Sequence, residues 1–173
     1  ADDLGYGDLS IFGNKYISTP NIDKLGHEGI IMTDFHSNGS VCSPTRAALL
    51  TGKYQQKVGV PGVITAKNHR DKGLSLVEKT FAEIAKEVGY KTGVFGKWHL
   101  GYDPKFSPIK QGFNEFIGFV SGNVDYHSHL DQEGFEDWWK GDSLFPETGY
   151  STDLISKHSI DFIKRNRNEN FLL

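Results

Sequence analysis

The chain has 173 residues, a formal net charge of −3, 37% hydrophobic residues and a single cysteine. This length suits one domain with a sizeable core, and 24% charged residues suit a globular chain. The composition gives no basic excess that would predict nucleic acid as a partner. No apolar run reaches the roughly 18 residues needed to span a membrane, and one cysteine excludes a disulfide framework.

The first predicted element is a short helix in TPNIDKLGHEG, residues 19–29. Thr19 can cap this helix, Pro20 fits its first position and Gly29 can end it. The apolar residues that follow, 30–35, predict a strand.

The next predicted helix lies in VCSPTRAALLTGK, residues 41–53, which holds the only cysteine. Ser43 is a good N-cap and Pro44 a good first helical residue, so we expect the helix to begin there. Cys42 then lies at a helix N-terminus, where free N–H groups and the macrodipole favour negative charge. Arg46 falls in the first turn, and its planar guanidinium fits a tetrahedral oxyanion. A buried cysteine beside a surface arginine is the alternative, but Pro and Arg at these offsets favour the anion site.

Two further helices and two short strands complete the predicted elements. Residues 75–88 carry an apolar helical stripe that begins with a Ser75–Glu78 capping box, and KTGVFG at 91–96 predicts a buried strand. Residues 152–165 predict a last helix before the strand-like end Phe-Leu-Leu. This alternation indicates an α/β fold with a largely parallel or mixed sheet flanked by helices, and both ends of the sequence read as cut.

Two more groups of residues lie where ligands gather in such folds, at the carboxyl ends of strands. Asp2 and Asp3 alone read as a solvated loop, but near Cys42 they suit a hard cation such as calcium. In the Lys-Trp-His run, Lys97 and His99 are two residues apart and would point the same way if extended. A solvated lysine and a loop histidine are the alternative for that run.

Three segments together resemble the sulfatase family. CSPTRAALLTGK is similar to its signature Cys-x-Pro-x-Arg with a Leu-Thr-Gly ending, and GYKTGVFGKWH, residues 89–99, to its second signature. ADDLGYGD resembles the family's first metal-binding segment. The resemblance implies the alkaline-phosphatase-like core of a type I sulfatase, with residues 1–173 as the N-terminal portion of one catalytic domain.

The resemblance also implies roles for individual residues. Cys42 would be the precursor of a formylglycine, converted by a formylglycine-generating enzyme. Asp2, Asp3 and residue 42 would bind a divalent cation, calcium rather than magnesium. Lys97 would bind both the sulfate and the formylglycine, and His99 would handle a proton on the latter.

Arg46 would join Lys97 in offsetting negative charge on the sulfate. Two more parts of the chain receive weaker assignments. In SGNVDYHSH we expect Ser121, His127 and His129 to contact the substrate, since no further soft ligand favours zinc at the two histidines. Trp138 and Trp139 suit either stacking on a ring of the substrate or core packing.

The resulting functional hypothesis is a sulfuric ester hydrolase that cleaves a sulfate monoester of a small molecule or a carbohydrate. The alternatives are a phosphonate or phosphodiester hydrolase with the same apparatus, or an inactive anion-binding fragment. We expect residues 1–173 alone to be inactive, because family members supply further metal ligands, a lysine and a histidine from later segments. By resemblance the protein would be periplasmic, secreted or lysosomal.

Overall fold

The computed structural model describes residues 3–173, so the predicted metal ligand Asp2 lies outside the described residues. The chain divides into two compact units, Ala1–His36 and Ser37–Leu173. No helix among the described residues is long and apolar enough to cross a bilayer.

The N-terminal unit contains short helices joined by a polar cluster. Its elements are η1 (Tyr6–Asp8), η2 (Ser10–Phe12) and α1 (Pro20–Glu28). The predicted helix is confirmed, with Thr19 before it and Gly29 after it. The Asp23 carboxylate accepts hydrogen bonds from the Ser10 hydroxyl, the Thr19 hydroxyl and the Ile11 N–H. These bonds join α1 to η2.

The strand predicted at residues 30–35 is wrong. These residues form turns and irregular backbone, and their apolar side chains are exposed, with Ile30 at 85% and Phe35 at 72%. A β-strand forms only where a neighbour completes its hydrogen bonds, and local apolar pattern does not reveal whether one is present.

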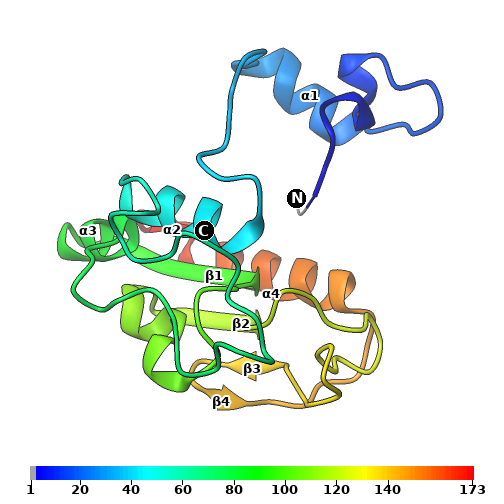
Figure 1. Ribbon diagram of the computed structural model, residues 1–173. Coiled ribbons are helices and arrows are strands. Elements are labelled where there is room, and N and C mark those ends of the chain that lie inside the picture. Colours follow the sequence, from blue (N-terminus) through cyan, green and yellow to red (C-terminus); the bar gives the residue numbers. More distant parts are fainter. Residues whose placement is uncertain (1–2) are drawn as a thin grey trace. The chain divides into compact units, whose positions relative to one another are not determined.

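The C-terminal unit contains one mixed sheet with strand order β4-β3-β2-β1-β5 (Figure 1). β1 pairs in parallel with β2 and β5, whereas β3 pairs antiparallel with β2 and β4. This confirms the predicted fold class. The strands are β1 (Lys91–Lys97), β2 (Glu115–Phe119), β3 (Trp139–Lys140), β4 (Ser143–Leu144) and β5 (Phe171–Leu172).

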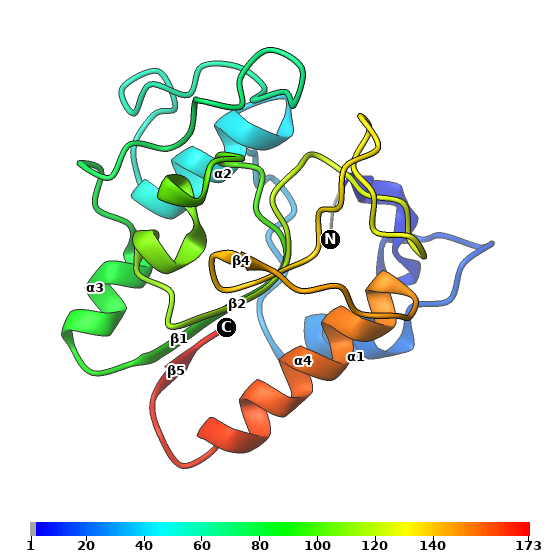
Figure 2. The ribbon, with the colours of Figure 1, turned by 90° about the horizontal axis from the view of Figure 1, so that it is seen from below.

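Helices cover both faces of this sheet, with α2 and α3 on one side and α4 on the other (Figure 2). Because successive residues of a strand point to opposite faces, Phe116 of β2 packs with the α2 and α3 side while Ile117 packs with Leu154 of α4. The remaining elements are α2 (Cys42–Thr51), α3 (Phe81–Glu87), η3 (Pro104–Phe106), η4 (Pro108–Gln111) and α4 (Ser151–Asn166).

The strand at 91–96 and the last helix are confirmed as β1 and α4, but α3 begins later than predicted. The capping box is formed by Thr80 and Glu83, not by Ser75 and Glu78. Thr80 is fully buried, and its hydroxyl also donates to the Gln111 carbonyl oxygen. This tertiary contact favours the later start.

Candidate active site

The C-terminal end of β1 meets the N-terminus of α2. Lys97 is the last residue of β1, and its Nζ donates a hydrogen bond to Cys42 Sγ at 3.1 Å. Arg46, one turn into α2, donates from Nη1 to the Lys97 carbonyl oxygen at 2.7 Å. The structure therefore links the three predicted residues, with the Lys97 ammonium against Cys42 and the Arg46 guanidinium against the Lys97 backbone.

The helix begins two residues earlier than predicted, which changes the role of Ser43. Val41 is the N-cap and makes no side-chain cap, while Cys42 is the first residue of α2. Ser43 is fully buried, and its Oγ accepts a hydrogen bond from the Ile64 N–H at 3.1 Å. The serine that read as a cap thus ties the loop at residue 64 to the helix N-terminus.

His99 is connected to the N-terminus of α2 through the backbone of Ile64. The His99 backbone is left-handed, with φ of 56°, so the extended Lys-Trp-His geometry that we expected does not hold. His99 is 4% exposed, and its Nε2 lies 2.9 Å from the Ile64 carbonyl oxygen. A carbonyl can only accept, so this contact requires a proton on Nε2.

Ile64 is the residue that sequence reasoning missed at this site. Its role is played by the backbone: the Ile64 N–H donates to Ser43 Oγ, and the Ile64 carbonyl oxygen accepts from His99 Nε2. A side-chain pattern carries no signal for such a role. The buried Ile64 side chain, at 6% exposure, joins the main core and fixes the peptide between the two residues.

The predicted metal ligands belong to different parts of the chain, with Asp2 outside the described residues and Cys42 in the C-terminal unit. Asp3 is exposed in the N-terminal unit and has a left-handed backbone, with φ of 53°. Among residues 3–173, no three His, Cys, Asp or Glu side chains are grouped so that they could hold a metal ion. The cation site at Asp2, Asp3 and residue 42 remains a prediction.

The three predicted substrate contacts lie in and before a hairpin at residues 124–137. His127 and His129 line one cavity of about 240 Å³, together with Asp137 and Trp138. The His129 ring stacks on Trp138 at 4.5 Å, and its Nε2 lies 3.0 Å from the Gly149 carbonyl oxygen. His129 is therefore built into the wall of this cavity, whereas His127 is exposed.

Ser121 follows the end of β2, and its N–H donates to Asp137, which lines the same cavity as the two histidines. Ser121 is 2% exposed, and its hydroxyl donates to the Asn123 carbonyl oxygen at 2.8 Å. This hydroxyl shapes its own turn. The contact of Ser121 with substrate stays a prediction, as do those of His127 and His129.

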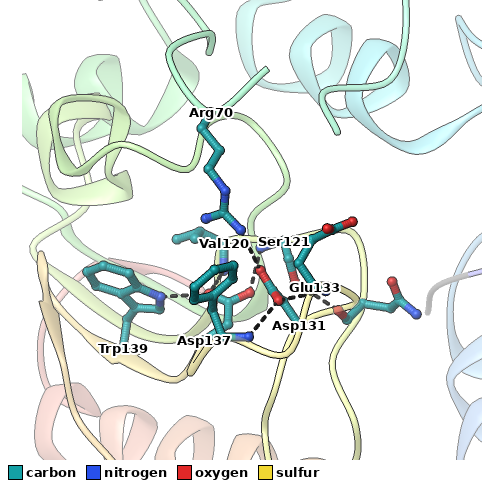
Figure 3. Close-up of polar contacts among 9 residues, drawn as sticks. Arg70, Val120, Ser121, Asp131, Glu133, Asp137 and Trp139 are labelled. Atoms are coloured by element: carbon teal, nitrogen blue, oxygen red, sulfur yellow. Dashed lines mark hydrogen bonds and ion pairs between the residues drawn. The ribbon is translucent and has the colours of Figure 1, made fainter. Parts of the chain in front are cut away.

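A buried carboxylate fixes the hairpin. Asp131 is 8% exposed and accepts a hydrogen bond from Arg70 Nη2 at 3.1 Å and one from the Glu133 N–H at 2.9 Å (Figure 3). The Arg70 guanidinium also lies 4.8 Å from the Phe135 ring centroid. The hairpin is thereby attached to the loop that contains Ile64.

Trp138 and Trp139 differ in burial, and this difference supports core packing for Trp138. Trp138 is 2% exposed, with its ring against His129. Trp139 is half-buried, and its Nε1 donates to Asp137 Oδ1 at 2.6 Å. Trp138 has too little free surface to stack on a sugar ring, so core packing is the better interpretation for it.

Comparison with known proteins agrees with the two signatures. A model of the Sulfatase family matches residues 1–173. Human arylsulfatase A is 48% identical over 121 residues, which cover 68% of this chain and 24% of that protein. N-acetylgalactosamine-6-sulfatase of Canis lupus familiaris is 34% identical over 184 residues, which cover 95% of this chain and 35% of the relative. The chain thus spans a quarter to about a third of the length of these curated relatives.

Solved structures show the same fold. The crystal structure of Ps i-CgsB gives a TM-score of 0.89 at 32% identity and covers 99% of this chain and 42% of that one. The same protein has been solved in complex with k-i-k-neocarrahexaose. BT4656, solved with its substrate D-glucosamine-2-N,6-O-disulfate, gives a TM-score of 0.78 at 28% identity and covers 98% of this chain and 31% of that one.

Proposed function

Since this chain belongs to the sulfatase family, we propose that it forms the sulfate-holding part of a sulfuric ester hydrolase. The contact between Lys97 Nζ and Cys42 Sγ, at 3.1 Å, carries this proposal. It joins the lone cysteine to a cation at a helix N-terminus, and this combination suits an anionic group that reacts at position 42.

Lys97 and Arg46 bind and orient the sulfate. Charge accumulates on the sulfuryl oxygens as the ester bond breaks, and positioned cationic donors stabilise that charge more in the transition state than in the ground state. The bond from Arg46 to the Lys97 carbonyl oxygen fixes the guanidinium against the end of β1. The first N–H groups of α2 add partial positive charge at the same place.

His99 moves a proton at the reacting residue. A histidine suits this work because its ordinary pKa lies near neutrality. With the proton on Nε2 held by the Ile64 carbonyl oxygen, the neutral ring has Nδ1 as its basic atom. We propose that Nδ1 accepts the proton that must leave position 42.

Two groups complete the proposed chemistry. Cys42 would be the precursor of a formylglycine, whose hydrate would supply the nucleophilic oxygen. Asp2, Asp3 and residue 42 would hold a divalent cation, calcium, which would lower the pKa of that oxygen. Adjacent carboxylates are hard oxygen donors, which is the donor chemistry that calcium prefers.

We propose a sulfated carbohydrate as the substrate. Ps i-CgsB and BT4656 are solved with carbohydrate ligands, and both share the fold of this chain at 28–32% identity. The cavity at His127 and His129 offers imidazole and carboxylate groups for sugar hydroxyls. Ser121 is proposed to contact substrate through the turn that follows β2.

One assay tests the reaction class. The natural protein that contains residues 1–173 is given a sulfate monoester and a phosphodiester, and the two kcat/KM values are compared. We expect the sulfate monoester to be preferred by at least about tenfold. A preference for the phosphodiester contradicts the proposal and supports the alternative hydrolase.

A second experiment tests position 42. Cys42→Ser is expected to lose multiple turnover and to gain the mass of one sulfate, because a serine ester has no second hydroxyl through which sulfate can leave. Mass spectrometry of the peptide containing residue 42 then identifies thiol, aldehyde or sulfated serine. Full steady-state activity of Cys42→Ser would exclude this mechanism.

A further inference from the structure

The turn at residues 120–122 lies against the His99 ring. A Cβ atom added to Gly122 would lie 2.8 Å from His99 Cε1 and 3.1 Å from His99 Nε2. Contacts below 3.0 Å are essentially never seen for real Cβ atoms. The bare backbone of Gly122 therefore forms one wall of the space that the His99 ring occupies, and a shift of this turn changes that space.

One carboxylate holds two successive backbone N–H groups of this turn. The Asp137 carboxylate accepts hydrogen bonds from the Val120 N–H at 3.0 Å and from the Ser121 N–H at 2.9 Å (Figure 3). Within the turn, the Ser121 hydroxyl donates to the Asn123 carbonyl oxygen. The turn is thus held mainly by the bonds of two of its backbone N–H groups to Asp137.

Asp137 is suited to this work by its buried position and its chemistry. It is 3% exposed, and burial raises the pKa of its carboxyl although hydrogen bonds from Ser121, Val120 and Trp139 oppose the rise. An ionised carboxylate has only acceptors, as converging N–H donors require. An asparagine has the same shape but turns an NH₂ group toward one of those donors, which leaves a buried N–H without its bond.

We propose that Asp137 is a positioning residue for His99. Its carboxylate fixes the turn at residues 120–122, and Gly122 in that turn keeps the His99 ring in place with Nε2 on the Ile64 carbonyl oxygen. The inference rests on the proposed function, because the proton transfer assigned to His99 needs Nδ1 as the basic atom.

The main test is Asp137→Asn in the natural protein that contains residues 1–173. We expect kcat to fall by about ten- to a hundredfold with KM within about twofold, since the change affects proton transfer more than binding. The second readout is the His99 tautomer, measured by ¹⁵N NMR of the histidine rings. The His99 signals are identified by their loss in His99→Gln. The parent protein is expected to hold the proton on Nε2, and Asp137→Asn to show a mixture of the two tautomers.

Two further variants separate positioning from general loss of structure. Trp139→Phe removes the indole donor to the same carboxylate but leaves both backbone bonds. The His99 tautomer is therefore expected to match that of the parent, and kcat is expected to stay within about twofold of the parental value. Gly122→Ala keeps Asp137 and crowds the ring directly, so it is expected to reproduce the tautomer change of Asp137→Asn.

Specific outcomes overturn the proposal. The proposal is overturned if a folded Asp137→Asn variant keeps the parental His99 tautomer and kcat. It is also overturned if the loss of activity in Asp137→Asn is fully explained by a smaller folded fraction of the protein. If Asp137→Asn does not fold, Gly122→Ala replaces it, since its added methyl group crowds the His99 ring directly; an unchanged His99 tautomer in that variant also overturns the proposal. The tautomer is measured without substrate, so it tests the positioning even if no sulfate ester is hydrolysed.

Discussion

Each of the two compact units of this chain is stabilised by a different kind of internal contact. In the N-terminal unit, none of the residues of η1, η2 and α1 is buried, and the polar cluster at Ser10, Thr19 and Asp23 joins residues at most 13 positions apart. In the C-terminal unit, two hydrophobic clusters occupy the two faces of the sheet. One unit depends on local polar bonds, and the other on a packed core.

This difference explains where a site can be built. The contacts from Lys97 to Cys42, from Arg46 to Lys97 and from His99 to Ile64 join residues 55, 51 and 35 positions apart. Such contacts exist only while the sheet and its helices are packed. Local bonds can open separately at little cost, so the N-terminal unit is expected to loosen before the site does.

The largest expected effect follows from removing core volume. Phe162 of α4 is fully buried, with its ring 5.5 Å from Phe95 and 5.9 Å from Phe171. Phe162→Ala is expected to lower the free energy of unfolding of the C-terminal unit by about 3–5 kcal/mol. Urea unfolding followed by tryptophan fluorescence measures this, because all three tryptophans lie in that unit.

Leu25→Ala is the matched control in α1. Leu25 is 72% exposed, so its truncation is expected to change the free energy of opening of α1, measured by amide exchange, by less than about 0.5 kcal/mol. Equal losses in the two variants would show that the units do not differ in the way described.

The second prediction concerns catalysis in the natural protein that contains residues 1–173. Lys97→Ala removes the cationic donor at Cys42, and kcat is expected to fall by about 10²–10³, as for the loss of one preorganised donor to a developing oxyanion. Lys91→Ala, at the other end of β1, removes an exposed lysine 3.6 Å from Glu169 and is expected to leave kcat unchanged. Similar kcat losses for both lysines would remove Lys97 from the site.

The sequence predicted the parts of this structure that depend on local pattern. α1, β1 and α4 follow from capping residues and apolar periodicity, and they are confirmed within two residues. The grouping of Cys42, Arg46 and Lys97 was implied by the resemblance of two separate segments to the signatures of the sulfatase family.

The features that the sequence did not predict depend on distant partners. The local sequence predicts Ser43 as a helix cap, yet its hydroxyl oxygen accepts a hydrogen bond from the Ile64 N–H, 21 positions away. The apolar run at 30–35 has strand composition without a strand neighbour in the described residues. Asp137 was overlooked beside two tryptophans, and its position in FEDWW, an acid amid aromatic residues, was the available signal.

The third prediction tests the polar cluster of the N-terminal unit by pH. The hydrogen bond from Ser10 lowers the pKa of Asp23, and further bonds from Thr19 and Ile11 act in the same direction. The stabilisation is therefore present above the unfolded pKa of about 3.9 and is lost as pH falls through the lower folded value. Amide exchange in α1 is expected to accelerate in that range before exchange in β1 does.

Asp23→Asn supplies the control for this titration. It removes the ionisable group, so exchange in α1 is expected to be fast already at neutral pH and to change little on acidification. If α1 and β1 lose protection together in the parent protein, the polar cluster is not what holds the N-terminal unit.

The smallest expected effect comes from a polar bond placed on the packed unit. Arg165 of α4 donates to both carboxylate oxygens of Glu115, at 2.8 and 2.7 Å, and this bond lowers the pKa of Glu115. Because both side chains are more than a third exposed, solvent screening limits its worth, and Arg165→Ala is expected to cost only about 0.5 kcal/mol. That cost should be present above the unfolded pKa of Glu115, about 4.3, and disappear as pH falls through the lower folded value. Urea unfolding at pH 7 and pH 3 measures both; a loss above about 2 kcal/mol would mean that the C-terminal unit, too, depends on a surface polar bond.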